Sequence, residues 1–123
     1  MRKLFLFLSV LLTVVSICFA NNKKCETFDN GLKGGLAVFV SSEKDPNDRD
    51  VTVQNYINTI TIASNGNKMR IITCQIKIGG KWISAYDPLG IVIEPYDKYS
   101  FEFKTSVKKL SSDDIKVTAE GCN

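Results

Sequence analysis

The chain has 123 residues and carries 16 lysines and arginines against 13 aspartates and glutamates, with no histidine. Positive charge is not clustered, so the sequence excludes the basic surfaces that bind nucleic acids or recruit membranes electrostatically. The lack of histidine excludes the commonest general base, histidine-activated nucleophiles and the usual catalytic zinc sites. Only carboxylates would remain for catalysis, so we expect a protein that is not an enzyme and that holds no metal or cofactor.

The N-terminus has the pattern of a signal peptide. Two basic residues precede an apolar run from Leu4 to Ile17, and Cys18 and Ala20 supply small residues before polarity returns. A retained membrane anchor would need about 18 or more apolar residues. Lipidation of Cys18 is a second alternative, but Ile17 is bulky where a small residue should stand. We predict cleavage after Ala20 and secretion to the extracellular space.

Removal of residues 1–20 from the 123 leaves 103 residues, 21–123, which suffice for one domain with one core. Two of the 16 basic residues leave with the signal peptide, so 14 basic residues face 13 acidic ones and the net charge falls to +1. We therefore expect a single secreted domain, monomeric and without membrane contact after the signal peptide is removed.

Three cysteines follow the predicted cleavage site, and their local patterns differ. Cys74 lies on the apolar face of an alternating segment, together with Ile72, Ile76 and Ile78, so we expect a buried thiol. Cys122 falls on the face opposite to the apolar residues of its own segment, and Cys25 lies in a polar lead-in. We predict a Cys25–Cys122 disulfide that ties the ends of the domain together. A Cys25–Cys74 bridge is the alternative.

Apolar residues alternate with polar ones through most of the mature chain, which is the period of a β-strand. A change of parity near Asn55 predicts a bulge or bend, and Gly79-Gly80 predicts a tight hairpin. The polar segment 41–50 predicts a loop. Its acidic residues Asp45, Asp48 and Asp50 are interrupted by Arg49, so they indicate a solvated loop rather than a calcium site. The expected strands are 35–40, 51–64 (as one strand or two), 69–78, 81–86, 91–93, 99–103 and 115–122.

Short strands with a turn signal about every ten residues predict an all-β fold. We expect an immunoglobulin-like, two-sheet antiparallel β-sandwich of about six to eight strands. The inter-sheet cysteine pair and the tryptophan spacing of antibody domains are missing.

The aromatic residues of segment 81–86 suggest a binding surface. Trp82, Ser84 and Tyr86 share one face of the expected strand, while Ile83 and Ala85 take the other. If the isoleucine side faces the core, the two aromatic rings look outward about 13 Å apart, a span that suits an extended polysaccharide. Tyr96 and Tyr56 could extend this strip, and Lys81 and Asp87 could add polar contacts. The competing interpretation places Trp82 in the core, as in immunoglobulin domains.

Three stretches also resemble the small cellulose-binding sandwiches that are appended to some glycoside hydrolases. They are Gln54–Ile62, Gly80–Ile83 and Ile93–Phe103, which together span about half of the mature chain. The resemblance implies non-catalytic carbohydrate binding, with Trp82 carried over as a stacking residue. No catalytic domain and no Ser/Thr/Pro-rich linker accompanies these stretches, and only Tyr86 stands as a second exposed aromatic.

Two functional hypotheses follow from these patterns. The first is an extracellular carbohydrate-binding module for cell-wall or matrix polysaccharide, with Trp82, Tyr86 and Tyr96 as its binding residues. The second is a secreted ligand or inhibitor that offers an edge strand or loop to a protein partner. The exposure of Trp82 distinguishes them, because burial would remove the argument for a glycan.

Overall fold

The computed structural model describes residues 24–31, 35–47 and 54–122, and these ranges form an all-β fold. The predicted signal peptide and its cleavage site, the end of the expected loop with Asp48 and Asp50, and the first residues of the expected strand 51–64 lie outside them. Within them, no helix has the length and apolar character needed to cross a bilayer. The strands are short and separated by turns, as the alternating pattern predicted.

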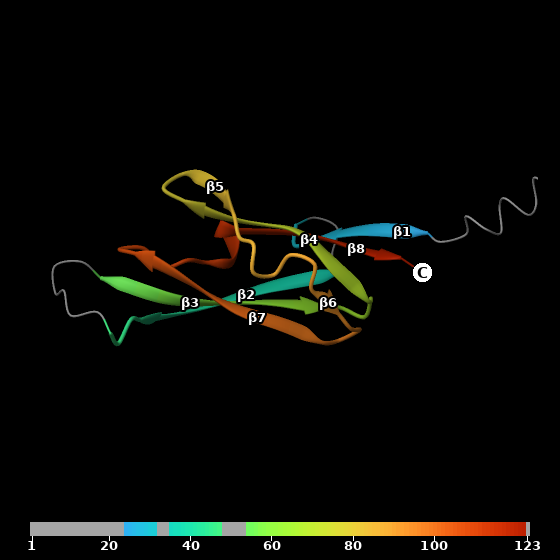
Figure 1. The fold of residues 1–123 in the computed structure, drawn as a ribbon, viewed down its shortest axis with the longest axis horizontal. Coiled ribbons are helices and arrows are strands. Elements are labelled where there is room, and N and C mark those ends of the chain that lie inside the picture. Colours follow the sequence, from blue (N-terminus) through green and yellow to red (C-terminus); the bar gives the residue numbers. More distant parts are fainter. Residues whose placement is uncertain (1–23, 32–34, 48–53, 123) are drawn as a thin grey trace, which may run out of the picture.

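Two antiparallel sheets face each other (Figure 1). In the larger sheet the strand order is β1-β8-β4-β5, and β6 also pairs with β4. The smaller sheet has the order β2-β3-β7. This arrangement confirms the predicted two-sheet β-sandwich. The elements are β1 (Cys25–Asp29), β2 (Leu36–Lys44), β3 (Asn55–Ser64), β4 (Met69–Ile78), β5 (Lys81–Ser84), β6 (Val92–Ile93), β7 (Lys98–Ser106), the 3-10 turn η1 (Ser112–Asp114) and β8 (Ile115–Cys122).

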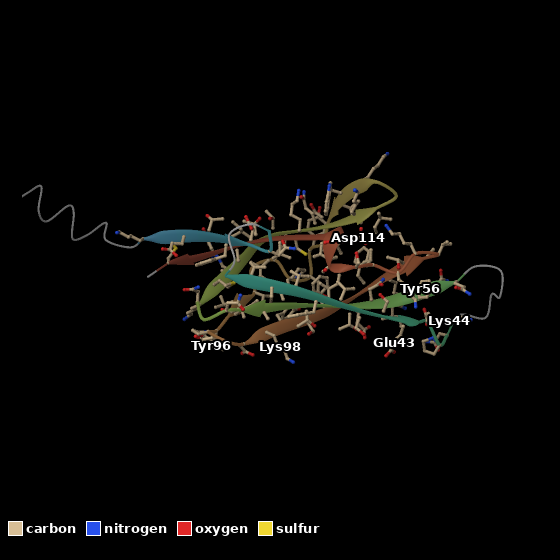
Figure 2. The ribbon with its side chains drawn as sticks, turned by 180° about the vertical axis from the view of Figure 1, so that it is seen from behind. Glu43, Lys44, Tyr56, Tyr96, Lys98 and Asp114 are labelled. Atoms are coloured by element: carbon tan, nitrogen blue, oxygen red, sulfur yellow. A yellow bond between two sulfur atoms is a disulfide. The ribbon has the colours of Figure 1, made fainter. Side chains whose placement is uncertain are left out.

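The core lies between the sheets, where the inward side chains of both are packed (Figure 2). In β3, β7 and β8 the inward residues are every second one, because side chains alternate between the faces of a sheet. β3 shows this most clearly, since its buried and half-buried positions alternate from Asn58 to Ser64. Six apolar core residues are fully buried, at 0% exposure: Ile60, Ile62, Ile71, Ile76, Val117 and Ala119.

Two of the residues expected on the core face of β4 are exposed. Ile78 is 38% exposed because it is the last residue of β4, beside the turn, whereas a β-bulge explains Ile72. Strict alternation placed Ile72 on the core face with Cys74, but Ile72 is 38% exposed and Ile71 is fully buried. The pairing of β4 with β8 shifts register between Ile71 and Thr73, which inserts one extra residue and reverses the parity. Cys74 is a buried free thiol, as predicted, and burial raises its pKa to about 11.

Several strand boundaries also differ from the expectation. β1 was not predicted, because only Phe28 of its five residues is buried and the segment has little apolar pattern. β2 continues to Lys44 through residues expected to form a loop, because it pairs with β3 along its whole length. β3 is one strand within the described residues, and the expected change of parity near Asn55 depends on residues 51–53, which lie outside them.

Asn58 is a fully buried polar residue, and its side-chain amide is hydrogen-bonded through both its nitrogen and its oxygen. Its Nδ2 group donates to the Phe103 carbonyl and to Thr105 Oγ1, both at 2.8 Å. Its Oδ1 atom accepts hydrogen bonds from Ser42 Oγ at 2.5 Å and from the Leu110 amide at 3.1 Å. The network joins all three strands of the smaller sheet and fixes the chain that follows β7 against them.

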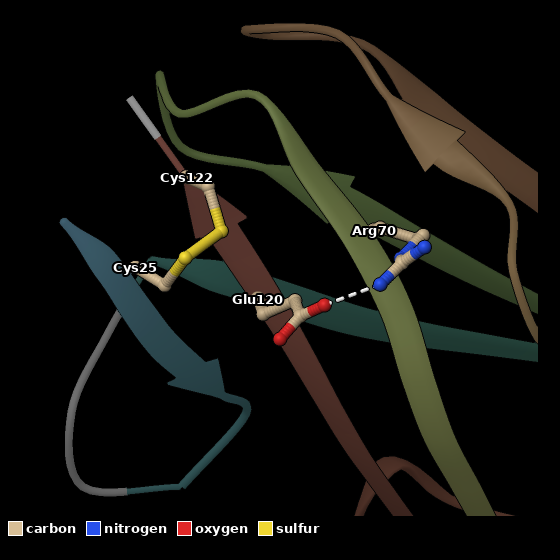
Figure 3. The surroundings of a disulfide bond; sticks show 4 residues. All are labelled: Cys25, Arg70, Glu120 and Cys122. Atoms are coloured by element: carbon tan, nitrogen blue, oxygen red, sulfur yellow. Dashed lines mark hydrogen bonds and ion pairs between the residues drawn. A yellow bond between two sulfur atoms is a disulfide. The ribbon is translucent and has the colours of Figure 1, made fainter. Parts of the chain in front are cut away.

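The Cys25–Cys122 disulfide is present, as predicted (Figure 3). It joins β1 to β8 at positions that are direct partners in the ladder. On the neighbouring strand pair, Arg70 of β4 donates to Glu120 of β8 at 2.5 Å. The covalent bond and the ion pair therefore fasten the same end of β8 to the strands on both sides of it.

Candidate functional site

Trp82 lies on β5, which a two-residue turn connects to β4. Gly79 and Gly80 connect β4 to β5 with φ angles of 57° and 80°. Positive φ at both central residues is the requirement of the hairpin turn that matches the twist of paired strands. The register that results pairs Trp82 with Lys77 and Ile83 with the buried Ile76. Trp82 therefore projects from the outer face of the larger sheet.

The indole ring of Trp82 lies near two lysines on this outer face. The Lys116 ammonium nitrogen is 4.6 Å from the ring centroid and that of Lys77 is 5.9 Å from it. Lys116 belongs to β8, on the far side of β4 from β5, so the ring extends across β4. Trp82 keeps 39% of its surface exposed. It is therefore a surface residue and not part of the core.

Trp82 forms part of the wall of a cleft of about 870 Å³, which we call the Trp82 cleft. The opposite wall comes from the end of β1, the start of β2 and the turn η1. Its lining is mostly apolar and combines one aromatic ring and several aliphatic side chains with amide, hydroxyl, carboxylate and ammonium groups. The lining residues are Thr27, Asp29, Asn30, Gly31, Leu36, Ala37, Val38, Trp82, Ser112, Asp113, Ile115 and Lys116.

Asn30 fixes the β1 side of the cleft. Its Nδ2 group donates to the Ile115 carbonyl at 2.6 Å, and its Oδ1 atom accepts from the Val117 amide at 2.9 Å. The side-chain amide thus continues the hydrogen bonding between β1 and β8 after β1 has ended. The carboxylate of Asp29 accepts from the Gly31 amide at 2.9 Å, which closes a turn of the kind that aspartate favours.

Asp113 and Ser112 reach the cleft because η1 is capped at its start. Asp114 accepts from the Ser111 amide at 3.0 Å and from Ser111 Oγ at 3.3 Å. These bonds, the backbone one above all, together with the nearby Lys108 ammonium, hold the pKa of the Asp114 carboxyl below its usual value despite desolvation. Asp114 is turned back into the protein, while its neighbour Asp113 lines the cleft.

Tyr86 is 78% exposed and follows the end of β5 by two residues. The next residue, Asp87, accepts a hydrogen bond of 2.7 Å from Tyr99 Oη, which raises the pKa of Tyr99. The loop after β5 is thereby tied to β7. Lys81, which precedes Trp82, is exposed.

Tyr96 is also exposed, at 84%, but lies far from Trp82. It packs against Gly66, so close that a Cβ atom added there would lie 3.0 Å from the Tyr96 hydroxyl oxygen. Gly66 precedes β4 and Trp82 follows it, so the two aromatic residues flank opposite ends of a strand about 30 Å long. Figure 2 shows Tyr56 at the end of the molecule opposite to Tyr96. The structure therefore does not gather Tyr56, Tyr96 and Trp82 into one strip.

The polar residues around Trp82 were missed from the sequence. Asp29 and Asn30 lie more than 80 residues before Asp113 and Lys116 in the sequence, and only the fold brings these two stretches together with Trp82. The sequence shows a turn signal at Asp29-Asn30-Gly31 and an outward position for Lys116. Neither pattern indicates that the two lie close together in space. Among the described residues there is no cluster of three or more side chains suited to hold a metal ion.

The fold and this surface define a two-sheet β-sandwich with a cleft that residues of both sheets line. No protein-family model, no curated protein and no solved structure matches the chain.

Proposed function

We propose that this protein is a secreted, non-catalytic module that binds an extracellular polysaccharide at the Trp82 cleft. The observation that carries the proposal is the partly exposed indole of Trp82 beside convergent polar groups of Asp29, Asn30 and Asp113. A sugar ring has an apolar face that stacks on a flat aromatic surface, and a rim of hydroxyl groups that donate to carboxylates and amides.

Secretion is supported by two features of the chain. The N-terminal segment has the charge, apolar run and small residues of a signal peptide. The Cys25–Cys122 disulfide is of the kind that forms and persists in oxidising compartments. An extracellular location would expose the cleft to cell-wall or matrix glycans.

The rigidity of the cleft wall favours binding. Asn30 is held at both ends of its side-chain amide by the main chain of β8, so it stays fixed whether or not a ligand is present. A wall that is already ordered loses little conformational entropy when a ligand binds. Tyr86, exposed just beyond β5, remains a candidate for a second stacking residue, and Tyr96 could contact only a long polysaccharide.

The experiment that tests the proposal is a titration of the single tryptophan's fluorescence with soluble oligosaccharides, neutral and acidic, followed by retention on insoluble polysaccharide. We expect the emission to change and retention to be lost in Trp82→Ala. Phe39→Ala is the matched control, because Phe39 is an aromatic residue 60% exposed on the smaller sheet. Failure of every oligosaccharide to bind, or equal retention of both variants, would overturn the proposal.

A second candidate function is the binding of a protein partner at the edge of the larger sheet. β5 is the last strand of the order β1-β8-β4-β5, and all four of its residues are exposed. An extended peptide could add to this free edge through main-chain hydrogen bonds. Ser84 lies at a position whose amide points away from β4, because the neighbouring Ala85 amide donates to the Cys74 carbonyl. Ser84→Pro, which removes this edge donor, would weaken such a complex while leaving glycan retention intact if Trp82 keeps its place.

A further inference from the structure

The charges around Trp82 are divided between two sides of the site. On one side, Lys116 and Lys77 carry their ammonium groups within 6 Å of the ring centroid, at 4.6 and 5.9 Å. On the other side, Asp29 and Asp113 line the opposite wall of the cleft. A ligand that stacks on the indole would therefore meet cations at one part of its ring and carboxylates at another.

The two lysines are not neutralised by the protein. The ion pairs within the described residues belong to other cations, namely Lys68 with Glu94, Arg70 with Glu120 and Lys108 with Asp114. A cation over an exposed aromatic ring is stabilised by only about 0.5–1 kcal/mol. This cation–π contact is therefore too weak to prevent the ammonium groups from binding an anion. Both remain available to an anion that arrives at the indole.

The two aspartates fit a different part of the same ligand. A carboxylate accepts hydrogen bonds but donates none, so Asp29 and Asp113 suit the hydroxyl groups of a sugar. Asp29 uses one oxygen for the Gly31 amide, and a carboxylate has lone pairs to spare for a further donor. An entirely neutral sugar would satisfy the aspartates but would leave the lysines without a counterpart.

Building on the proposed function, we infer that the ligand is an acidic polysaccharide built from uronic acids. Its sugar ring stacks on Trp82, its carboxylate lies beside Lys116 and Lys77, and its hydroxyl groups donate to Asp29 and Asp113. The two lysines are the residues that determine specificity, and Trp82 contributes the affinity that acidic and neutral sugars share.

The test uses two oligosaccharides that differ only in charge. One is a cello-oligosaccharide, and the other is the same oligomer with each primary alcohol oxidised to a carboxylate, which makes it a β-1,4-linked glucuronate. Dissociation constants are measured by calorimetry and by Trp82 fluorescence at low and high salt. We expect the acidic oligomer to bind roughly tenfold more tightly at low salt, with the preference shrinking as salt is added.

Lysine variants identify the groups responsible. Lys116→Gln and Lys77→Gln should each weaken binding of the acidic oligomer about threefold to fivefold, the range of an exposed ion pair, and leave the neutral one unchanged. Lys98→Gln and Lys104→Gln are matched controls, because they make the same charge change at exposed positions of β7 in the smaller sheet. All four lysines are exposed, so their substitution should leave the fold intact.

The outcomes separate the two proposals. Equal affinity for both oligomers, with binding lost in Trp82→Ala, would overturn the inference of an acidic ligand and leave the proposed function standing. A preference for the acidic oligomer that the control lysines reduce as much as Lys116 and Lys77 do would also overturn it, because net charge alone would then explain the effect. Binding of neither oligomer would contradict both proposals.

Discussion

The outer faces of the two sheets each expose a large aromatic residue, but their surroundings differ. Phe39 on the smaller sheet is 60% exposed, and its paired neighbour Thr61 bonds to Ser100 across the sheet at 2.8 Å. Trp82 on the larger sheet is less exposed, at 39%, yet it lines a cleft with charged and amide side chains from two other stretches of the chain. Exposure of a ring alone therefore does not mark a binding surface, whereas convergence of polar groups around it does.

Two asparagines, one in each half of the molecule, also differ in what their hydrogen bonds do. Asn58 is fully buried in the smaller sheet and makes four hydrogen bonds that hold the fold together. Asn30 is partly buried beside the larger sheet and makes two bonds that shape the wall of the cleft. One residue type thus stabilises the core of one sheet and positions the candidate site on the other.

The largest effect is expected for Asn58→Ala. The substitution removes four hydrogen bonds and leaves the buried Leu110 amide without its Asn58 acceptor, while Thr105 keeps its bond to the Lys108 carbonyl. We expect a loss of about 3 kcal/mol in the free energy of unfolding. Urea unfolding would measure it. Thr59→Ala, one residue along β3, is the control and should cost under about 1 kcal/mol. A loss of unfolding free energy as small as that of Thr59→Ala would show that the Asn58 hydrogen bonds do not stabilise the fold.

Asn30→Ala should have a smaller effect on stability but a direct one on the site. Two hydrogen bonds to the main chain of β8 are lost, so we expect about 1–2 kcal/mol of destabilisation. The wall of the cleft also loosens, so oligosaccharide affinity should fall in a protein that is still folded. Asn65→Ala, at an exposed turn, should change neither quantity. Unchanged affinity in Asn30→Ala would show that this wall does not take part in binding.

The smallest effect concerns pH and Asp114. Its pKa in the folded protein lies below the ordinary value of 3.8, chiefly because of the Ser111 amide, so the ionised form stabilises the fold above about pH 4. This contribution is lost as the pH falls through the folded pKa. The difference in unfolding free energy between the wild type and Asp114→Asn should therefore be largest near neutral pH and shrink in acid. A difference that grows in acid would contradict the assignment.

The fold could largely be predicted because its strands alternate. β7 and β8 show apolar and polar residues in strict succession, and the glycine pair between β4 and β5 specifies its own turn. The bulge at Ile72 could not be predicted, since a bulge depends on pairing with β8, far along the chain. β1 was missed because it is stabilised by Phe28, the disulfide and the ladder to β8 rather than by an apolar pattern.

The candidate site could be predicted only in part, for the same physical reason. The outward direction of Trp82 follows from strand parity, which is local. The approach of Lys116 and Asn30 to Trp82 follows from the order of strands in the larger sheet, which is not local. Tyr96 is also an exposed aromatic residue, but it lies beyond the other end of β4 from Trp82. Its distance from Trp82 likewise depends on the fold and could not be predicted from local sequence.

The most direct test of the central claim is a nitrogen-15 NMR titration with the neutral and acidic oligosaccharides. The chain has one tryptophan, so its indole N–H gives one signal, and the side-chain amides of Asn30 and Asn58 report on the cleft and on the core. We predict that the Trp82 and Asn30 signals move together on titration while the Asn58 signal stays in place. Signals of Trp82 and Asn30 that stay unchanged with every oligosaccharide would contradict the assignment of this cleft as a glycan-binding site.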